Sequence, residues 1–155
     1  MSVASFAAQA QELKIGYVNT ERVMREANLA KAAGAKLEAE FSKRERELKE
    51  HETRLRAAAE KLDKDGPTLS EAERNRRQRD LVEQDRDLQR KRREWQEDLT
   101  QRRNEELSLV VERANRVVKH IFETEKYDLI VQDAIHASNR VDITKKVIDA
   151  LNAQK

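Results

Sequence analysis

The side chains of this 155-residue chain that could do chemistry are mostly charged: 32 Lys or Arg and 30 Asp or Glu, for a formal net charge of +2. They are unevenly distributed, because residues 74–93 hold nine basic and four acidic residues, a local net charge of +5. A concentration of positive charge attracts anionic partners and raises their rate of encounter. The basic residues of this cluster are Arg74, Arg76, Arg77, Arg79, Arg86, Arg90, Lys91, Arg92 and Arg93.

This basic cluster has three interpretations. It is either a solvated helix surface paired with its own acidic neighbours, or a contact site for acidic partners or anionic lipid headgroups. Nucleic-acid binding is the least favoured, because the stretch has neither aromatic stacking residues nor a known module. Trp95, the only tryptophan, is expected to pack between two helices; the alternative is an exposed apolar contact for a partner.

No constellation in the chain is typical of catalysis. The absence of cysteine excludes disulfides, thiolate metal sites and cysteine nucleophiles. His51, His120 and His136 do not have the spacing of metal ligands, and no glycine-rich phosphate loop or nucleophile motif is present. We therefore expect no active site, no metal, no cofactor and no enzymatic activity.

The elements that position these charges are predicted to be long helices. Forty per cent of the residues are charged, 4% are aromatic, and there are only three Gly and one Pro, a composition typical of long helices and coiled coils. From Val23 a heptad pattern begins whose first seam stays mostly apolar. This seam consists of Ala27, Gly34, Phe41, Leu48, Leu55 and Leu62. The second seam turns polar or small at Arg44, His51 and Ala58, so its packing should weaken along the helix.

A turn should separate this helix from a second one. Gly66 and Pro67 predict the helix end, with Gly in the terminating position, and Ser70 with Glu73 forms a capping box that starts the next helix. The returning helix carries Leu88, Leu99, Val110 and Ile121 at eleven-residue spacing. Pairs at i,i+4, such as Glu73/Arg77 and Asp98/Arg102, should support both helices. The sequence therefore predicts an antiparallel hairpin with its tip near residues 65–70.

The two ends of the chain are predicted to form a small apolar body. Residues 13–19 read as a strand followed by an Asn19 or Thr20 helix cap, and Tyr127–Val131 as a buried strand. Ala134–Val141 is expected to be a further short strand. Asp142 should cap a final helix whose apolar stripe comprises Ile143, Val147, Ile148 and Leu151.

These predictions give an α+β chain with a helical hairpin inserted in a small β body. Residues 107–151 hold eighteen large apolar side chains, against nine in 44–106, so we assign 11–22 and 107–155 to the body and 23–106 to the hairpin. A body this small is expected to complete its core by oligomerisation. The residues assigned to it are Ile15, Tyr17, Val18, Val110, Val117, Ile121, Tyr127, Leu129, Val131, Ile143 and Val147.

The first ten residues stand apart from the charged sequence that follows. Residues 2–10 are small or apolar apart from Gln9, and Ala8-Gln9-Ala10 matches the small-x-small pattern before a signal-peptidase cut. We interpret 1–10 as the end of a signal peptide, the alternative being a disordered N-terminus. The longest apolar run is shorter than a membrane-spanning helix requires.

The chain resembles the Skp/OmpH family of periplasmic chaperones over about residues 13–152. The resemblance is carried by KIGYVN at Lys14–Asn19 and by YDLIVQDAIHASNRVDITKKVIDAL at Tyr127–Leu151, which flank the charged hairpin. The DIT triplet at Asp142–Thr144 precedes the last helix. One departure is His136, where relatives often carry an aromatic residue.

The resemblance implies a homotrimer in which strands of three subunits form a β-barrel and three hairpins surround a cavity as tentacles. It implies a periplasmic protein that holds unfolded outer-membrane β-barrel proteins without ATP and delivers them for outer-membrane assembly. The basic cluster would then contact clients, anionic lipid or lipopolysaccharide. The alternatives are a coiled-coil scaffold for a folded partner, or a basic protein that binds the envelope or nucleic acid.

Overall fold

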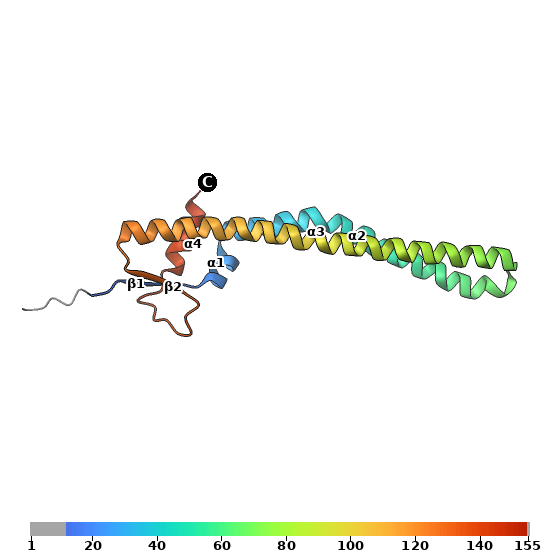
Figure 1. Ribbon diagram of the computed structural model, residues 1–155, viewed down its shortest axis with the longest axis horizontal. Coiled ribbons are helices and arrows are strands. Elements are labelled where there is room, and N and C mark those ends of the chain that lie inside the picture. Colours follow the sequence, from blue (N-terminus) through green and yellow to red (C-terminus); the bar gives the residue numbers. More distant parts are fainter. Residues whose placement is uncertain (1–11, 155) are drawn as a thin grey trace, which may run out of the picture. The chain divides into compact units, whose positions relative to one another are not determined.

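The structure, a computed structural model, describes residues 12–154. The elements are β1 (Ile15–Val18), α1 (Thr20–Glu26), α2 (Asn28–Asp65), the 3-10 helix η1 (Gly66–Thr68), α3 (Glu71–Glu125), β2 (Leu129–Gln132) and α4 (Thr144–Ala153) (Figure 1). They form two compact units. The hairpin unit comprises residues 33–107, and the body unit comprises 12–32 together with 108–154. Residues 1–10, with the predicted signal-peptide end, lie outside the described residues.

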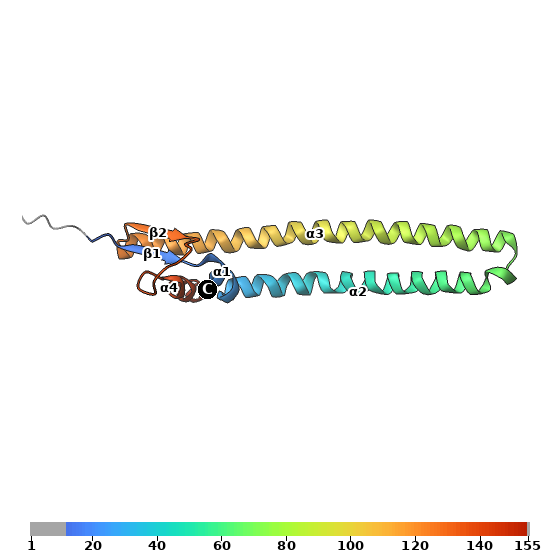
Figure 2. The ribbon, with the colours of Figure 1, turned by 90° about the horizontal axis from the view of Figure 1, so that it is seen from below.

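The hairpin unit consists of α2 from residue 33 onward, η1, and α3 up to residue 107. The two helices run side by side up to the turn (Figure 1, Figure 2). The predicted helix end is confirmed at Asp65, but its mechanism is different. Gly66 does not take a positive φ; instead a 3-10 turn with Pro67 in its first turn follows the helix directly. The Ser70 hydroxyl accepts from the Glu73 N–H at 3.2 Å, as a capping box requires. The Glu73 carboxylate, however, pairs with Arg77 at 3.1 Å.

The predicted seam of the hairpin is largely confirmed. Phe41 and Leu62 of α2 and Leu88 of α3 are buried, and Leu48 and Leu55 are half-buried. Gly34, by contrast, is exposed, and a Cβ at this position would have no neighbour within 4 Å. Gly34 is therefore not required for close helix packing in this structure.

The helix predicted from Val23 is broken at Ala27. Ala27 is fully buried, and its ψ of 135° is extended, so α1 ends before it and α2 begins after it. The N–H of Asn28 donates to Oδ1 of Asn152 at 2.8 Å. The first N–H of α2 is thus satisfied by a side chain from α4, as a helix N-terminus requires.

The sheet pairs the two ends of the chain, as predicted. β1 and β2 are parallel, with Ile15 opposite Leu129. On the other edge of β1, Tyr17 N–H donates to Val141 O at 2.7 Å, and Ile143 N–H donates to Tyr17 O at 2.9 Å.

The predicted strand at 134–141 is wrong. This stretch is a loop in the structure, and Ile135 is 92% exposed. An isolated bridge between Tyr17 and Asp142 follows the loop. The second edge of β1 is therefore occupied by the residues just before α4. Residues 135–140 are exposed, so their side chains have no buried face to pack against, and the stretch does not form a strand.

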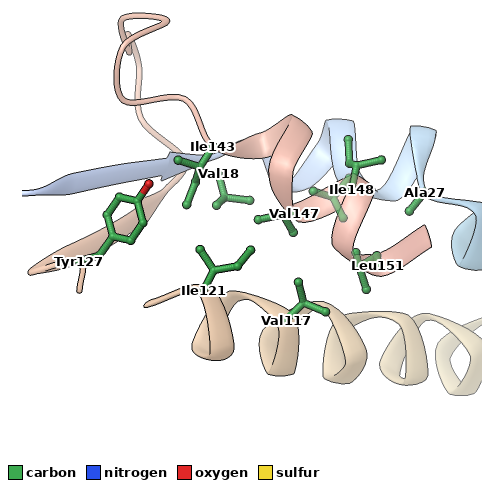
Figure 3. Close-up of a cluster of buried hydrophobic side chains, with 10 residues drawn as sticks. Val18, Ala27, Val117, Ile121, Tyr127, Ile143, Val147, Ile148 and Leu151 are labelled. Carbon is green, nitrogen blue, oxygen red and sulfur yellow. The ribbon is translucent and has the colours of Figure 1, made fainter. Parts of the chain in front are cut away.

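The core of the body unit lies between α3, α4, α1 and β1, where Val147 and Leu151 point toward Ile121 and Val117 (Figure 3). The predicted apolar stripe is confirmed: Val147, Ile148 and Leu151 of α4 are buried, and so is Ile143, which directly precedes the helix. The predicted cap at Asn19 is present, whereas the N-cap of α4 is Ile143 and not Asp142; Asp142 Oδ1, one residue before it, accepts from the Thr144 N–H at 2.8 Å. The buried core residues are Val18, Val23, Ala27, Val117, Ile121, Tyr127, Ile143, Val147, Ile148 and Leu151.

Candidate binding surfaces

The nine residues of the basic cluster all lie on α3, and four of them form ion pairs. Arg77 pairs with Glu73, and Lys91 pairs with Asp87 at 2.7 Å. Arg90 pairs with Asp87 and with Glu94, and Arg92 reaches Glu52 on α2 at 2.6 Å. Hydrogen bonds from Lys91 and Arg90 lower the pKa of Asp87, which keeps this carboxylate charged. These four cations are largely neutralised within the hairpin.

The other five basic residues have no carboxylate oxygen within 4 Å among the described residues. All five are exposed: Arg74, Arg76, Arg79, Arg86 and Arg93. Three of them, Arg79, Arg86 and Arg93, recur every seven residues. At 100° per residue this row lies opposite the side of α3 that carries Leu88 and Trp95. The structure thus separates the predicted cluster into four paired residues and five unpaired ones. Arg79, Arg86 and Arg93 are called the unpaired row below.

A shallow hollow of about 680 Å³ lies along this row. Val82, which is 51% exposed, lies among its lining residues. The hollow is lined by Asn75, Gln78, Arg79, Val82, Glu83 and Arg86. An apolar contact point beside unpaired guanidinium groups suits an extended anionic or amphipathic partner, because guanidinium groups bind carboxylate and phosphate in fork geometry.

Trp95 packs between the hairpin helices rather than into open space. Its ring meets that of Phe41 on α2 edge to face, with centroids 6.4 Å apart and an interplanar angle of 76°. The guanidinium of Arg44 lies 5.7 Å from the centre of the Phe41 ring. The indole N–H is buried and has no hydrogen-bond partner among the residues that the structure describes. These contacts favour the packing interpretation over an exposed contact.

Ion pairs between α2 and α3 are a feature that the sequence did not reveal. The i,i+4 spacing predicted that Asp98 pairs with Arg102. In the structure Asp98 pairs with Arg44 on α2 instead, at 2.8 Å. Arg102 instead joins Glu40 at 3.3 Å and Glu106 at 2.9 Å. The one signal in the sequence for these ion pairs was the position of Glu106, which follows Leu99 by seven residues and so lies on the side of α3 that faces α2.

Most residues assigned to the oligomerisation body are buried within this chain. Six belong to its core, and Val110 is also buried. Tyr17 and Val131 are half-buried. Ile15 and Leu129, which face each other across the sheet, are 39% and 50% exposed. The six core members are Val18, Val117, Ile121, Tyr127, Ile143 and Val147.

The body unit also exposes apolar side chains of α3. Leu109, Val111 and Phe122 are 52%, 42% and 38% exposed. Scattered apolar side chains are normal at a surface, but several large ones on one small unit mark an interaction surface. The sequence placed this stretch of α3 in the body without separating its buried residues from its exposed ones.

Metal-ligating groups and membrane-spanning helices were sought within the described residues. Within residues 12–154 no three His, Cys, Asp or Glu side chains are grouped so that they could hold a metal ion. None of the helices in that range is both long and apolar enough to cross a membrane.

Known proteins are similar to this chain in sequence and in architecture. The chain is 29% identical to the chaperone protein Skp of Pectobacterium atrosepticum over 94% of this chain and 88% of that protein. It is 24% identical to a Skp-like protein of Pseudomonas aeruginosa over 91% of this chain and 85% of that protein. The crystal structure of an OmpH-like protein from Caulobacter crescentus CB15 superposes with a TM-score of 0.80 at 20% identity, covering 98% of this chain and 91% of that one.

A model of the family described as outer membrane protein (OmpH-like) matches residues 14–151. This match includes β1, both hairpin helices, β2 and most of α4. The resemblance noted from the two ends of the chain is thereby confirmed, and the protein belongs to the OmpH-like family, among whose relatives are the Skp chaperones.

Proposed function

We propose that this protein is a homotrimeric, ATP-independent holdase of the periplasm. It binds unfolded outer-membrane β-barrel proteins in a cavity between hairpin tentacles, prevents their aggregation and delivers them for outer-membrane assembly. Family membership supports the chaperone role, since relatives over most of the chain are named chaperones. The proposal includes no enzymatic step and no cofactor.

The observation that carries the trimeric part is the uncovered apolar surface of the body unit. Leu109, Val111 and Phe122 of α3 and the cross-strand pair Ile15 and Leu129 remain exposed in one chain. Burial of apolar surface between subunits would stabilise the assembly by roughly 25 cal/mol per Å². We propose that three bodies cover these residues and that their strands complete a β-barrel.

The unpaired row on α3 supports the electrostatic part of client capture. Arg79, Arg86 and Arg93 have no carboxylate within 4 Å among the described residues, so their charge is available to acidic segments of an unfolded client. Charge of this kind raises association rates more than it stabilises a complex that has already formed. Added salt should therefore slow client capture more than it speeds client release.

The decisive experiment measures the mass of the assembly by light scattering and then dilutes a urea-unfolded outer-membrane barrel protein into a stoichiometric amount of it without ATP. A trimer that keeps the barrel protein from scattering light is the expected result. A monomer that leaves aggregation unchanged would overturn the proposal. Binding to one folded protein without any protection of unfolded chains would instead favour a coiled-coil scaffold.

A matched pair of variants isolates the basic row. Changing Arg79, Arg86 and Arg93 together to Gln should slow capture, whereas changing the ion-paired Arg77, Arg90 and Arg92 to Gln should slow it less. Equal effects would mean that total charge, not the unpaired row, governs capture.

The same row supports a second proposed contact, with anionic lipid or lipopolysaccharide. Guanidinium groups hold phosphate through paired hydrogen bonds, and Val82 lies beside two of them. Sedimentation with vesicles containing anionic lipid, compared with neutral vesicles, tests this contact. Equal sedimentation with both would contradict it, and retention on single-stranded nucleic acid at moderate salt would favour the nucleic-acid alternative.

A further inference from the structure

A layer of charge joins the two helices of the hairpin unit. The Glu106 side chain on α3 is only 9% exposed, and its Oε1 accepts from Lys36 Nζ on α2 at 2.5 Å. Arg102 Nη2, one turn earlier on α3, donates to the same oxygen at 2.9 Å. Arg102 also reaches Glu40 on α2 at 3.3 Å and pairs with Glu105. We call these five residues the ionic layer.

The ionic layer lies where the seam between the helices should be apolar. Glu106 follows Leu99 by seven residues, and it is buried as a seam residue would be. On α2, the nearby Gly34 contributes no side chain, and the space around it is open. Elsewhere in the hairpin the contact between the helices includes apolar rings, as at Phe41 and Trp95. At the ionic layer, ion pairs join α2 to α3.

The charge of Glu106 is supported from both helices. The hydrogen bond from Lys36 is the strongest influence that lowers the pKa of Glu106 below the ordinary value of 4.5, and Arg102 adds to it. The other charged groups of the layer are Glu40 from α2 and Glu105 from α3, both of which pair with Arg102. Lys36 has Glu106 as its partner within 4 Å among the described residues. Neutralising Glu106, the buried member of the pair, therefore removes the charge that holds the 59% exposed Lys36 of α2 against α3.

We propose that the ionic layer is a pH-sensitive latch: protonation of Glu106 separates α2 from α3 at this layer, while the contact of Phe41 with Trp95 keeps the adjoining part of the hairpin paired. The direction of the pH effect follows from the linkage between proton binding by Glu106 and the pairing of the helices. A carboxyl whose pKa is lower in the paired state favours pairing above the unpaired pKa and loses that effect as the pH falls through the paired value. The latch is independent of the proposed holdase activity, because it concerns distances within one chain.

The chain has no cysteine, so pairs of introduced cysteines can carry spin labels without background. Ala39 and Asn104 lie among the residues of the ionic layer, and Ala57 and Gln84 lie nearer the tip on α2 and α3; all four are exposed. Labelled chains diluted with unlabelled chains report distances within one subunit by pulsed electron resonance. The distance between positions 39 and 104 should shift to longer and broader values as the pH falls below 4.5. The distance between positions 57 and 84 should remain unchanged until helicity is lost.

A substitution separates the latch from general acid unfolding. Glu106→Gln should lengthen and broaden the 39–104 distance already at neutral pH. Glu97→Gln is the matched control, because Glu97 is an exposed carboxylate on the same helix, and it should leave that distance as in the wild type. A Glu106→Gln distance equal to the wild type would overturn the proposal. Should that variant not fold, the wild-type titration decides: a narrow 39–104 distance down to the pH at which helicity is lost would equally overturn it.

Discussion

The hydroxyl of Thr144 accepts a hydrogen bond from the backbone N–H of Asn19 at 2.9 Å, which joins positions 125 residues apart. Thr144 is fully buried in the first turn of α4, and Asn19 caps α1. The contact therefore fixes the start of one helix against the start of another. It ties the two ends of the chain together where the body unit is built.

Replacing Thr144 by Val should destabilise the body unit by about 1–3 kcal/mol, because the Asn19 N–H loses its acceptor while the size of the side chain is kept. Urea unfolding followed by circular dichroism measures the change. Thr144→Ser keeps the oxygen and loses only a methyl group, so it should cost less than Thr144→Val. A Ser variant that is less stable than the Val variant would show that packing, not the hydrogen bond, governs this position.

Gly16 is required by its surroundings in β1. A Cβ at this position would lie 2.9 Å from Ile143 Cδ1, 3.2 Å from Tyr127 Cε1 and 3.3 Å from Ile130 Cγ1. Gly16→Ala should therefore destabilise the body by about 1–3 kcal/mol through overpacking. Gly34→Ala is the contrasting control, since its Cβ enters open space and should stabilise α2 by about 1 kcal/mol. Thermal unfolding of both variants against the wild type tests the opposite signs.

Lys126 ends α3 in a left-handed conformation, with a φ of 58°. The next residue, Tyr127, donates its N–H back to Phe122 O at 3.2 Å, which is the pattern of a helix C-terminal motif that normally uses glycine. Lys126→Gly should stabilise the body by about 1 kcal/mol, because glycine adopts this φ without steric cost. Lys126→Ala removes the charge without the conformational benefit and should not stabilise. Equal midpoints of urea unfolding for both variants would contradict this account.

The sequence predicted those elements whose pattern is repeated over many residues. Apolar residues recur at the helical period several times along α2, α3 and α4. Tertiary contacts did not override a helical preference that is repeated so often. The break at Ala27 could not be predicted in this way, because Ala27 also fits the helical seam. The break is stabilised by Asn152, a side chain 124 residues away that accepts from the N–H of α2.

The candidate binding surface was predictable in place but not in detail. Local charge density located the basic cluster on α3, yet pairing depends on the neighbouring helix. Arg92 is paired because Glu52 of α2 lies opposite it, and Asp98 is paired with Arg44 rather than Arg102 for the same reason. Exposed side chains have several partners within reach at nearly equal free energy, so spacing along one helix does not select among them.

The hairpin is thinly packed near Ala58, as the small residue in the second seam predicted. An open hollow of about 270 Å³ lies there between α2 and α3, lined by Ala58 and Leu81 among others. Ala58→Leu should stabilise this end of the hairpin by about 1 kcal/mol, because the added side chain covers Leu81. Ala57→Leu places the same side chain one position away and should change stability less. Hydrogen exchange of the amides of α2, followed by mass spectrometry, locates the effect; equal protection in both variants would exclude the hollow as its cause.

The stability of the body unit should respond to acid through Glu125. Glu125, at the end of α3, accepts from Lys146 Nζ on α4 at 2.6 Å, and this hydrogen bond lowers the pKa of Glu125 below 4.5. Lys14 from the strand end adds to the effect at 3.8 Å. Because the carboxyl releases its proton more readily in the folded state, the stabilisation is complete above 4.5 and is lost as the pH falls through the folded value.

Lys146→Gln should therefore lower the stability of the body at neutral pH and flatten its decline in acid. Lys145→Gln is the matched control, because the neighbouring Lys145 pairs with Asp149 within α4 and does not reach Glu125. Urea midpoints measured from neutral pH down to about one unit below the ordinary Glu value give the slope for each chain. A Lys146→Gln chain whose stability declines as steeply as that of the wild type would show that another carboxylate governs the acid response of the body.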